Sequence, residues 1–229
     1  MPAHADEVPN NASTTQGQSE LDPLLKPAAR KFESPERFIF EGHVGPYSVL
    51  KDNAAGDFFR DDRGPAFGAH LDGIVYRLPK WVYVTVGGRI DYLKFSGNAV
   101  QRANGQQVGE ETTLSVVPLT ATAGVRFDAL PRQLHVPIIF GARVGWEWAY
   151  WSAATGDRDE ASGWALGPWV SAQIALDLDT FEPGGARILD EEWGINHTYF
   201  FGEVYHFAPT AKSLELGATS WVLGLGFVF

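Results

Sequence analysis

The chain has no cysteine, no basic excess and no long apolar run. Without cysteine, disulfides, thiol catalysis and thiolate metal ligands are excluded. With 18 Lys and Arg against 28 Asp and Glu, the net charge of -10 argues against nucleic acid as a partner. No stretch approaches the roughly 18 apolar residues of a transmembrane helix. These absences do not exclude a membrane barrel, because its strands are only half apolar.

Glycine and aromatic residues are abundant, with 25 Gly and 8 Trp among 229 residues. This length predicts one domain plus a tail. Residues 1–37 are rich in Pro, Asn, Ser and Gln and poor in large apolar residues, which predicts a disordered N-terminal segment. Ala3-His4-Ala5 has the small-x-small form of a signal-peptide cleavage site, so a signal-peptide remnant is one interpretation and a chance match the other.

From residue 38 onward, eight segments alternate between apolar and polar residues. In the third, Val84 and Val86 share one face, while Thr85 and Arg89 share the other. A period of two over such lengths predicts β-strands, each long enough for the roughly 9–11 tilted residues that cross a bilayer. The predicted strands are 38–50, 65–78, 81–95, 112–127, 136–151, 164–178, 198–207 and 220–229.

The connectors between these segments differ in length on the two sides. Those predicted to face outward are long and polar: 51–64, 96–111, 152–163 and 208–219. The inner connectors are 79–80, 128–135 and the longer 179–197, in which 186–193 is predicted to be a short helix between two glycines. Long outer loops and short inner turns are typical of outer-membrane barrels. Pro118 and Pro168 fall inside predicted strands, and we expect both at bulges near a rim.

The two faces of the strands differ in charge. One is almost free of charge, whereas the other combines ions with glycines, which suits the narrow, side-chain-filled interior of an eight-stranded barrel. The predicted lumen polar network consists of Glu41, His43, His70, Asp72, Arg89, Asp91, Arg126, Arg143, Glu147, Asp177 and Glu203. The predicted interfacial aromatic girdles consist of Trp81, Tyr92, Trp146, Trp148, Tyr150, Trp151, Trp164 and Trp221.

The last segment ends on an aromatic residue. Its large apolar residues alternate with small ones, and Phe229 closes the chain. Such a strand resembles the signal that bacterial outer-membrane barrels present to their assembly machinery. The resemblance implies that this machinery is a partner and that the signal consists of Trp221, Leu223, Leu225, Phe227 and Phe229.

Residues 193–203 read Trp-Gly-Ile-Asn-His-Thr-Tyr-Phe-Phe-Gly-Glu. This block resembles one in an outer-membrane β-barrel family of myxobacteria and their relatives. Weaker similarities are residues 109–112, the turn at 134–137 and the closing 221–225. The resemblance covers residues 38–229 and implies an outer-membrane barrel, but it assigns no activity and therefore no functional residues. We expect Asn196 and His197 to anchor the inner connector.

Three kinds of chemistry are possible alternatives. Glu41, His43, His70 and Asp72 could meet inside the barrel as a metal or acid–base site, although a satisfied polar network explains them as well. His206 with Ser152 or Ser162 could form the Ser–His pair of a lipid A-modifying enzyme. Loop acids could recruit Ca²⁺ or Mg²⁺, although solvated charge explains them too: Asp52, Asp57, Asp61, Asp62, Asp157, Asp159 and Glu160.

The sequence therefore predicts an all-β protein, an eight-stranded antiparallel up-and-down transmembrane β-barrel over 38–229 behind the disordered segment 1–37. We expect it in the bacterial outer membrane, in contact with lipid and lipopolysaccharide. The expected role is structural or surface interaction, without catalysis, cofactor or metal. A general diffusion pore is not expected, while a narrow ion path stays open. The alternatives are a barrel enzyme acting on lipid A or phospholipid and a soluble lipocalin-like binder.

Overall fold

A computed structural model describes residues 35–48, 63–78, 81–100, 107–155, 158–210 and 218–229. Within these ranges the chain forms eight strands and two short helices. The strands are β1 (Phe38–Ser48), β2 (Arg63–Leu78), β3 (Val82–Val100), β4 (Gln107–Phe127), β5 (Ile138–Thr155), β6 (Arg158–Asp177), β7 (His197–Phe207) and β8 (Ala218–Val228). Neither helix in the described part is long and apolar enough to cross a membrane.

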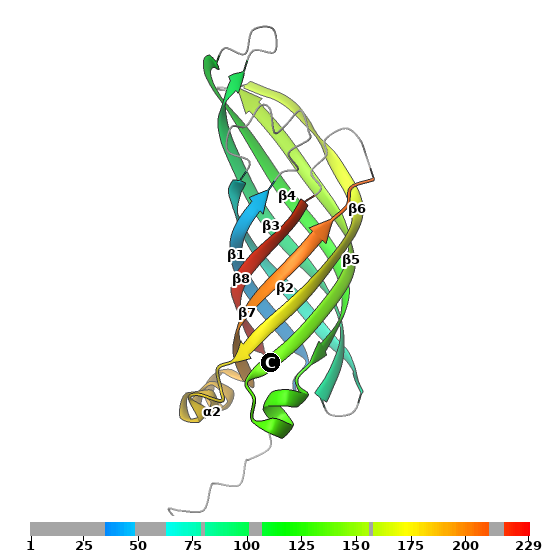
Figure 1. Cartoon of the computed structure of the whole chain (residues 1–229), viewed down its shortest axis with the longest axis vertical. Coiled ribbons are helices and arrows are strands. Elements are labelled where there is room, and N and C mark those ends of the chain that lie inside the picture. Colours follow the sequence, from blue (N-terminus) through cyan, green and yellow to red (C-terminus); the bar gives the residue numbers. More distant parts are fainter. Residues whose placement is uncertain (1–34, 49–62, 79–80, 101–106, 156–157, 211–217) are drawn as a thin grey trace, which may run out of the picture. The chain divides into compact units, whose positions relative to one another are not determined.

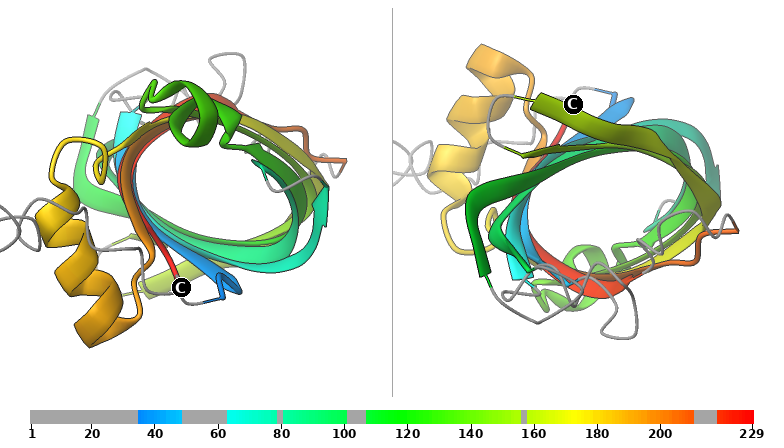
Figure 2. Two further views of the ribbon diagram at one scale, coloured as in Figure 1. Left: turned by 90° about the horizontal axis from the view of Figure 1, so that it is seen from below. Right: turned by 90° about the horizontal axis from the view of Figure 1, so that it is seen from above.

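The strands form one closed barrel in sequence order, and every neighbouring pair is antiparallel. Figure 1 shows their common tilt, and Figure 2 shows the closed outline from both ends. β8 closes on β1 from Ile39↔Val228 to Val44↔Leu223. The Phe229 carbonyl also accepts from the backbone N–H groups of Arg37 and Phe38. The terminal strand therefore has no free edge, and the predicted fold class is confirmed.

Several strands run further than the sequence pattern predicted. β3 continues to Val100 and β4 begins at Gln107, so most of the connector expected at 96–111 is strand. The connector expected at 152–163 is likewise mostly strand, because β5 ends at Thr155 and β6 begins at Arg158. The outer ends of these strands are polar, but their backbones remain paired. Because pairing of the backbone needs no apolar face, such hairpins can continue beyond the membrane. Figure 1 shows these four strands reaching furthest from the end of the barrel at which the C-terminus is marked.

The expectation that both prolines lie at bulges is wrong. The β3–β4 ladder lapses between Ile90↔Leu119 and Leu93↔Val116, next to Pro118, but it resumes in the same register. Pro168 pairs with Trp146 of β5, while on its other side the β7 ladder begins one residue later at Trp169↔Phe207. Pro168 therefore lies just beyond the end of β7, where its missing N–H removes no hydrogen bond from the β6–β7 ladder. The register shifts lie elsewhere, between Ile74 and Tyr76, Asn98 and Val100, and Ala153 and Ala154.

In its inner and middle parts the barrel is apolar outside and polar inside. Large apolar side chains such as Val86, Val144 and Ile174 are exposed on the exterior, while charged side chains of the same strands are buried. On β5 this apolar belt runs from Ile138 to Tyr150, about the length that a bilayer requires. Above Tyr150 the outward positions become polar, and they are occupied by Ser115, Ser152 and Ser162, which pair across the strands.

The aromatic residues mark both limits of this belt, with one correction. Tyr150 and Trp164 contact each other near its outer limit, with ring centroids 5.2 Å apart. Trp81 and Phe127 are equally close at the inner one. Trp151, which we assigned to the outer girdle, packs instead against the buried core. It follows Tyr150 by one residue, and successive strand residues point to opposite faces.

Both helices lie in inner connectors, at the end where residues 35 and 229 lie. The π-helix η2 (Leu130–Leu134) joins β4 to β5 and was not predicted. The helix α2 (Pro183–Trp193) joins β6 to β7 and begins three residues before the predicted 186–193. Pro183 is favoured at the start of a helix, and the Glu182 side chain accepts from the Gly185 N–H. Gly194, with φ 68°, ends the helix in the left-handed conformation.

Candidate functional site: the lumen charge network and the inner mouth

All eleven side chains of the predicted lumen polar network are buried. They do not form one cluster. Nine lie in the middle of the barrel, whereas Arg126 and Asp177 line a small cavity at the inner mouth. Toward the outer end the interior becomes apolar. The lumen therefore has three layers: a charged middle, an apolar outer part and a polar inner mouth.

Arg143 is the centre of the charge network. Its guanidinium contacts three carboxylates from three strands, at 2.9 Å from Glu41, 3.1 Å from Asp72 and 3.5 Å from Glu203. Glu41 also accepts hydrogen bonds from the Tyr199 hydroxyl at 2.6 Å and the Gln173 amide at 2.8 Å. Every group around Arg143 thus has charged or hydrogen-bonded partners, as burial of ions requires.

Arg89 extends the network toward the outer end. It bonds Asp91 at 2.6 Å and Glu203 at 3.1 Å, so that Glu203 links the two arginines. Its guanidinium also lies over the ring of Tyr205, 4.6 Å from the centroid, and 5.6 Å from that of Trp169. These contacts join the charges to the apolar layer above them.

Of the four residues considered as a metal or acid–base site, Glu41, His70 and Asp72 lie together, whereas His43 has a different partner. His70 lies 3.2 Å from Asp72 and 3.9 Å from Glu41, opposite which it stands on the neighbouring strand. His43 instead bonds Asp91 at 2.7 Å, across β2. Both carboxylates near His70 already contact Arg143. This geometry is that of a buried polar network in which Nε2 of each histidine has a partner and Nδ1 has no hydrogen bond.

Glycines make two of these contacts possible. Gly68 stands between His43 and Asp91 in the strand register, and a Cβ there would collide with both side chains. Gly226 lies opposite Tyr199, and a Cβ there would overlap the ring whose hydroxyl bonds Glu41. The glycines on the polar face therefore make room for side chains that cross a neighbouring strand.

Two predicted members have less charged surroundings. The Glu147 carboxylate accepts from the Thr120 hydroxyl at 3.3 Å. The Arg126 guanidinium stacks on the Tyr199 ring, 3.9 Å from its centroid. Sequence reasoning did not include Tyr199 or Gln173 in the network. Their positions on the polar face of β7 and β6 were the available signal, because they share the parity of Glu203 and Asp177.

Aromatic and aliphatic side chains fill the outer part of the lumen. Trp169 stacks on Tyr205 at 6.1 Å between centroids, and Tyr47 meets Phe95 edge-on at 6.2 Å. Trp169 and Phe207 are each only 1% exposed. This plug belongs to the buried core, which also includes Leu93, Leu114, Val116, Ala149 and Ala165. The interior of the described barrel is thus closed by side chains above the charge network.

Glu36 closes the inner mouth. Its buried carboxylate lies 2.7 Å from Arg132 of η2, 3.1 Å from Arg77 of β2 and 3.2 Å from His197 of β7. It lines a cavity of about 30 Å³ together with Arg126 and Asp177. Burial raises the pKa of Glu36, but the hydrogen bonds and charges of His197 and Arg132 outweigh it and hold this pKa well below its ordinary value. Residues 35–37, which the sequence placed in the N-terminal segment, therefore contact the barrel.

Replacing Glu36 with glutamine should lower the free energy of unfolding by about 1.5–3 kcal/mol, because three donors lose a charged acceptor. The folded pKa lies below the ordinary 4.5, so the contribution is complete above that pH and is lost as pH falls through the folded value. Urea unfolding in vesicles would measure the difference from wild type. The difference should be constant from about pH 6.5, below which His197 is protonated in both proteins, down to about pH 4.5, and it should narrow below that pH. The stabilising role of the Glu36 carboxylate would be contradicted if the difference from wild type had vanished by pH 6. It would also be contradicted if Glu192→Gln on exposed α2 lowered the free energy of unfolding by the same amount.

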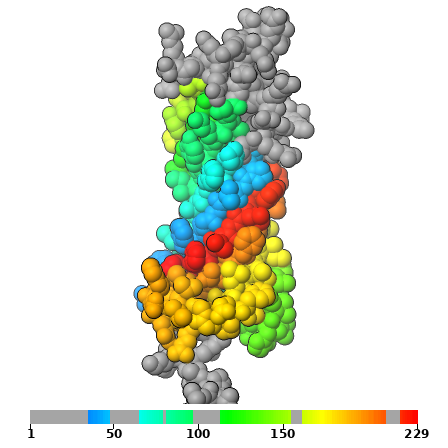
Figure 3. All heavy atoms as spheres, turned by 90° about the vertical axis from the view of Figure 1, so that its left-hand side faces the viewer, coloured from blue at the N-terminus to red at the C-terminus, as the bar shows by residue number. Residues whose placement is uncertain are grey.

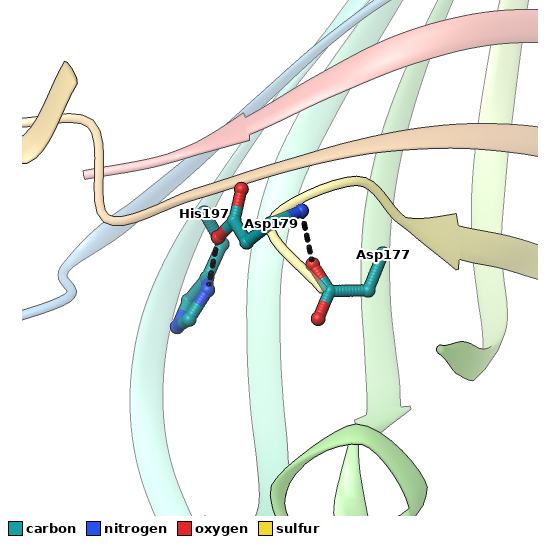
Figure 4. A group of neighbouring side chains, drawn as sticks. All are labelled: Asp177, Asp179 and His197. Carbon is teal, nitrogen blue, oxygen red and sulfur yellow. Dashed lines mark hydrogen bonds and ion pairs between the residues drawn. The ribbon is translucent and has the colours of Figure 1, made fainter. Parts of the chain in front are cut away.

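Asp177, Asp179 and His197 are a possible metal-ligand group, with one donor atom each within 4.8 Å of the others. Figure 4 shows them at the junction of β6, β7 and the connector. Their atoms have protein partners: His197 Nδ1 lies 2.7 Å from Asp179, which also accepts from the Thr198 N–H. Asp177 accepts from the Asp179 N–H and the Thr180 hydroxyl. The group thus holds the connector closed, and His197 anchors it as expected. The backbone N–H of Asn196 adds a bond to the Val228 carbonyl.

The Ser–His pair of the enzymatic alternative is not formed. His206 Nδ1 contacts the Thr219 hydroxyl at 2.8 Å, and its register partner on β6 is Val170. Ser162 lies eight residues away along β6, a separation of roughly 26 Å, and Ser152 stands opposite Ser162 on the far strand. The acids at 52–62 and Asp157 lie outside the described residues. For Asp159 and Glu160 the structure describes the backbone, which belongs to β6.

A closed antiparallel barrel with an apolar exterior, aromatic limits and a charged, filled interior defines a class. These are the features of an integral outer-membrane β-barrel. The surface chemistry places the chain in a lipid membrane, because in water such an exterior would expose a continuous apolar belt. Barrels of this class lie in the bacterial outer membrane.

No family model matches the chain, and no curated protein matches it in sequence. Among solved structures, the attachment invasion locus protein Ail of Yersinia pestis is 12% identical, with a TM-score of 0.46, over 86% of this chain and 100% of that one. Neisserial surface protein A is 11% identical, with a TM-score of 0.43, over 84% of this chain and 95% of that one. The N-terminal β-barrel domain of Pseudomonas aeruginosa OprF is 10% identical, with a TM-score of 0.41, over 85% of this chain and 98% of that one. At these identities and TM-scores, the likenesses carry no argument about activity.

Proposed function

We propose that the protein is a small structural or surface-interaction barrel of the outer membrane, without catalysis, and that it belongs to the myxobacterial-type family resembled by residues 193–203. The observation that carries the proposal is the filled lumen. Glu36 occupies the inner mouth, Arg143 centres a buried charge network, and Trp169 is part of the outer plug. A barrel closed in this way offers no wide passage to solutes.

The four long strands β3 to β6 support an interaction role. β3 to β6 continue past the polar row of Ser115, Ser152 and Ser162, so both of their hairpins rise beyond the apolar belt (Figure 1). Strands that leave the membrane with paired backbones present their ends to the medium. Lipopolysaccharide or another surface component would be the partner met there.

The terminal strand supports a second proposed partner, the barrel-assembly machinery. Trp221, Leu223 and Leu225 are exposed on the exterior of β8, and Phe229 is bonded to β1 through its carbonyl. Together with Phe227 they form the apolar face that the machinery would read before β1 and β8 close. After closure the same residues contact lipid.

The two alternative functions have less support. An enzyme acting on lipid A or phospholipid would need a nucleophile next to a base, and His206 lies far from Ser152 and Ser162 in the strand register. A lipocalin-like binder would carry polar side chains outside and an apolar cavity inside. Here the exterior is apolar and the described interior holds ion pairs.

The proposal predicts that the protein remains in the membrane fraction until detergent is added and migrates faster on gels before boiling than after. In planar bilayers, the purified protein should give no stepwise ion conductance, because its lumen is filled. A protein that stayed in aqueous extract and ran unchanged after boiling would refute the membrane assignment. Large conductance steps would refute the closed lumen, and release of acyl chains or sugars from lipopolysaccharide would refute the absence of catalysis.

A further inference from the structure

Helix α2 lies beside the barrel wall, not beneath the barrel. Figure 2 shows it outside the closed outline, and Figure 3 shows the orange connector standing out from the lower part of the wall. It joins the inner ends of β6 and β7. The outward side chains there, Leu176 and Phe200, stand opposite each other in register and belong to the apolar belt. The helix is therefore continuous with the inner edge of the lipid-facing surface.

The connector exposes three large apolar side chains. Phe181 is 63% exposed, Ile188 55% and Trp193 72%, as much as the belt residues that face lipid. The helix does not depend on the barrel for its ends, since Glu182 and Gly194 cap it and Arg187 pairs with Glu191 on its surface. Exposed Trp and Phe on a capped amphipathic helix are typical of helices that lie in a membrane interface.

The spacing places the apolar side chains on one side of α2. At 3.6 residues per turn, Ile188 and Trp193 are about 140° apart, and Arg187 lies roughly opposite the midpoint between them. Glu192 falls between the two apolar residues, one turn after Ile188. A carboxylate in that position suits the headgroup level of a bilayer and opposes deeper insertion.

The charge of the connector limits the lipid that it can bind. Glu182, Asp190, Glu191 and Glu192 outnumber Arg187, so the segment is acidic. Anionic headgroups would repel it, whereas the ammonium of a zwitterionic phospholipid can approach its carboxylates.

We propose that α2 is an interfacial helix that docks, through Phe181, Ile188 and Trp193, on zwitterionic phospholipid at the inner surface of the outer membrane. Docking covers the apolar side chains that the barrel leaves exposed and fixes the depth and rotation of the barrel at its inner end. The proposal rests on the membrane assignment made above, but it adds a lipid contact that the barrel itself does not need.

The absence of cysteine allows single-site labelling of the full chain. We would attach an environment-sensitive fluorophore to Ile188→Cys in the full-length protein, refolded into phosphatidylcholine–phosphatidylethanolamine vesicles with spin-labelled phosphatidylcholine as quencher. Ile188→Cys should show blue-shifted emission and lipid quenching, whereas Arg187→Cys on the opposite side should be quenched by aqueous iodide. Replacing part of the zwitterionic lipid with phosphatidylglycerol at low salt should shift the Ile188 signal toward water.

Val144→Cys on the lipid-facing wall separates the two proposals. If Val144 is quenched by lipid while Ile188 and Arg187 are equally exposed to iodide, the helix does not dock and the membrane assignment stands. If Val144 is not quenched either, the membrane assignment itself fails. Shielding of Ile188 that disappears on dilution of the protein in lipid would show a second copy as the occupant and would overturn the lipid proposal.

Discussion

Replacing Arg143 with methionine is expected to lower the free energy of unfolding by about 3–5 kcal/mol, the largest loss from any single lumen substitution. Arg143 contacts Glu41, Asp72 and Glu203 within a water-poor interior. Its removal leaves these carboxylates without their shared cation, and the cost of an uncompensated buried charge exceeds the net value of the original pair. Reversible urea unfolding in lipid vesicles, followed by tryptophan fluorescence, would measure the loss.

Two further variants test the reason for this loss. Arg143→Lys keeps the charge but cannot fork between several carboxylates, so its loss should lie between wild type and methionine. Arg187→Ala removes an arginine from an exposed pair on α2 and should cost at most about 0.5 kcal/mol. A loss of less than about 1 kcal/mol in Arg143→Met would mean that the network is solvated and not a buried ion cluster.

Replacing Val144 with arginine should cost about 2–4 kcal/mol, because this side chain faces the middle of the apolar belt. The matched control is Ser152→Arg, on the same face of β5 but beyond Tyr150. It lies among the outward serines, so the same charge there should cost only about 0–1 kcal/mol. The vesicle unfolding assay applies to both variants.

The two arginine variants also test whether the exterior of the barrel faces lipid or water. In a soluble barrel Val144 would face water, and arginine there would be neutral or would improve solubility. Equal stability of Val144→Arg and Ser152→Arg would therefore contradict the lipid-facing exterior, whereas a depth-dependent difference is a property of membrane-spanning strands.

The faces of the strands could be predicted because strand side chains alternate with a fixed period of two. That period assigns Glu41 and His43 to one face of β1 and the flanking Phe40 and Val44 to the other, whatever the partners of β1. It also contained the information that Trp151 points inward, which its position near a strand end obscured. The lengths of β3 to β6 were not predictable from apolar alternation, since their outer ends are polar and paired through the backbone.

The contacts inside the lumen depend on register, which the pattern does not contain. His43 contacts Asp91 and not His70. Gly68 of β2 lies between His43 and Asp91 in the register, and its missing side chain leaves room for their contact. Glu36 could not be predicted as a barrel residue, because the composition of residues 1–37 predicted a disordered segment. Its three cationic partners come from β2, η2 and β7. Only the closed barrel brings those elements to one mouth.

By itself, the sequence determined that the chain forms membrane-length strands with one charged and one apolar face, since period, composition and strand length are local properties. The tertiary structure decided which charges share a site, where the lumen is closed and how α2 lies beside the wall. These follow from the shear and closure of the barrel, which set the neighbours of every inward side chain across strands far apart in the chain.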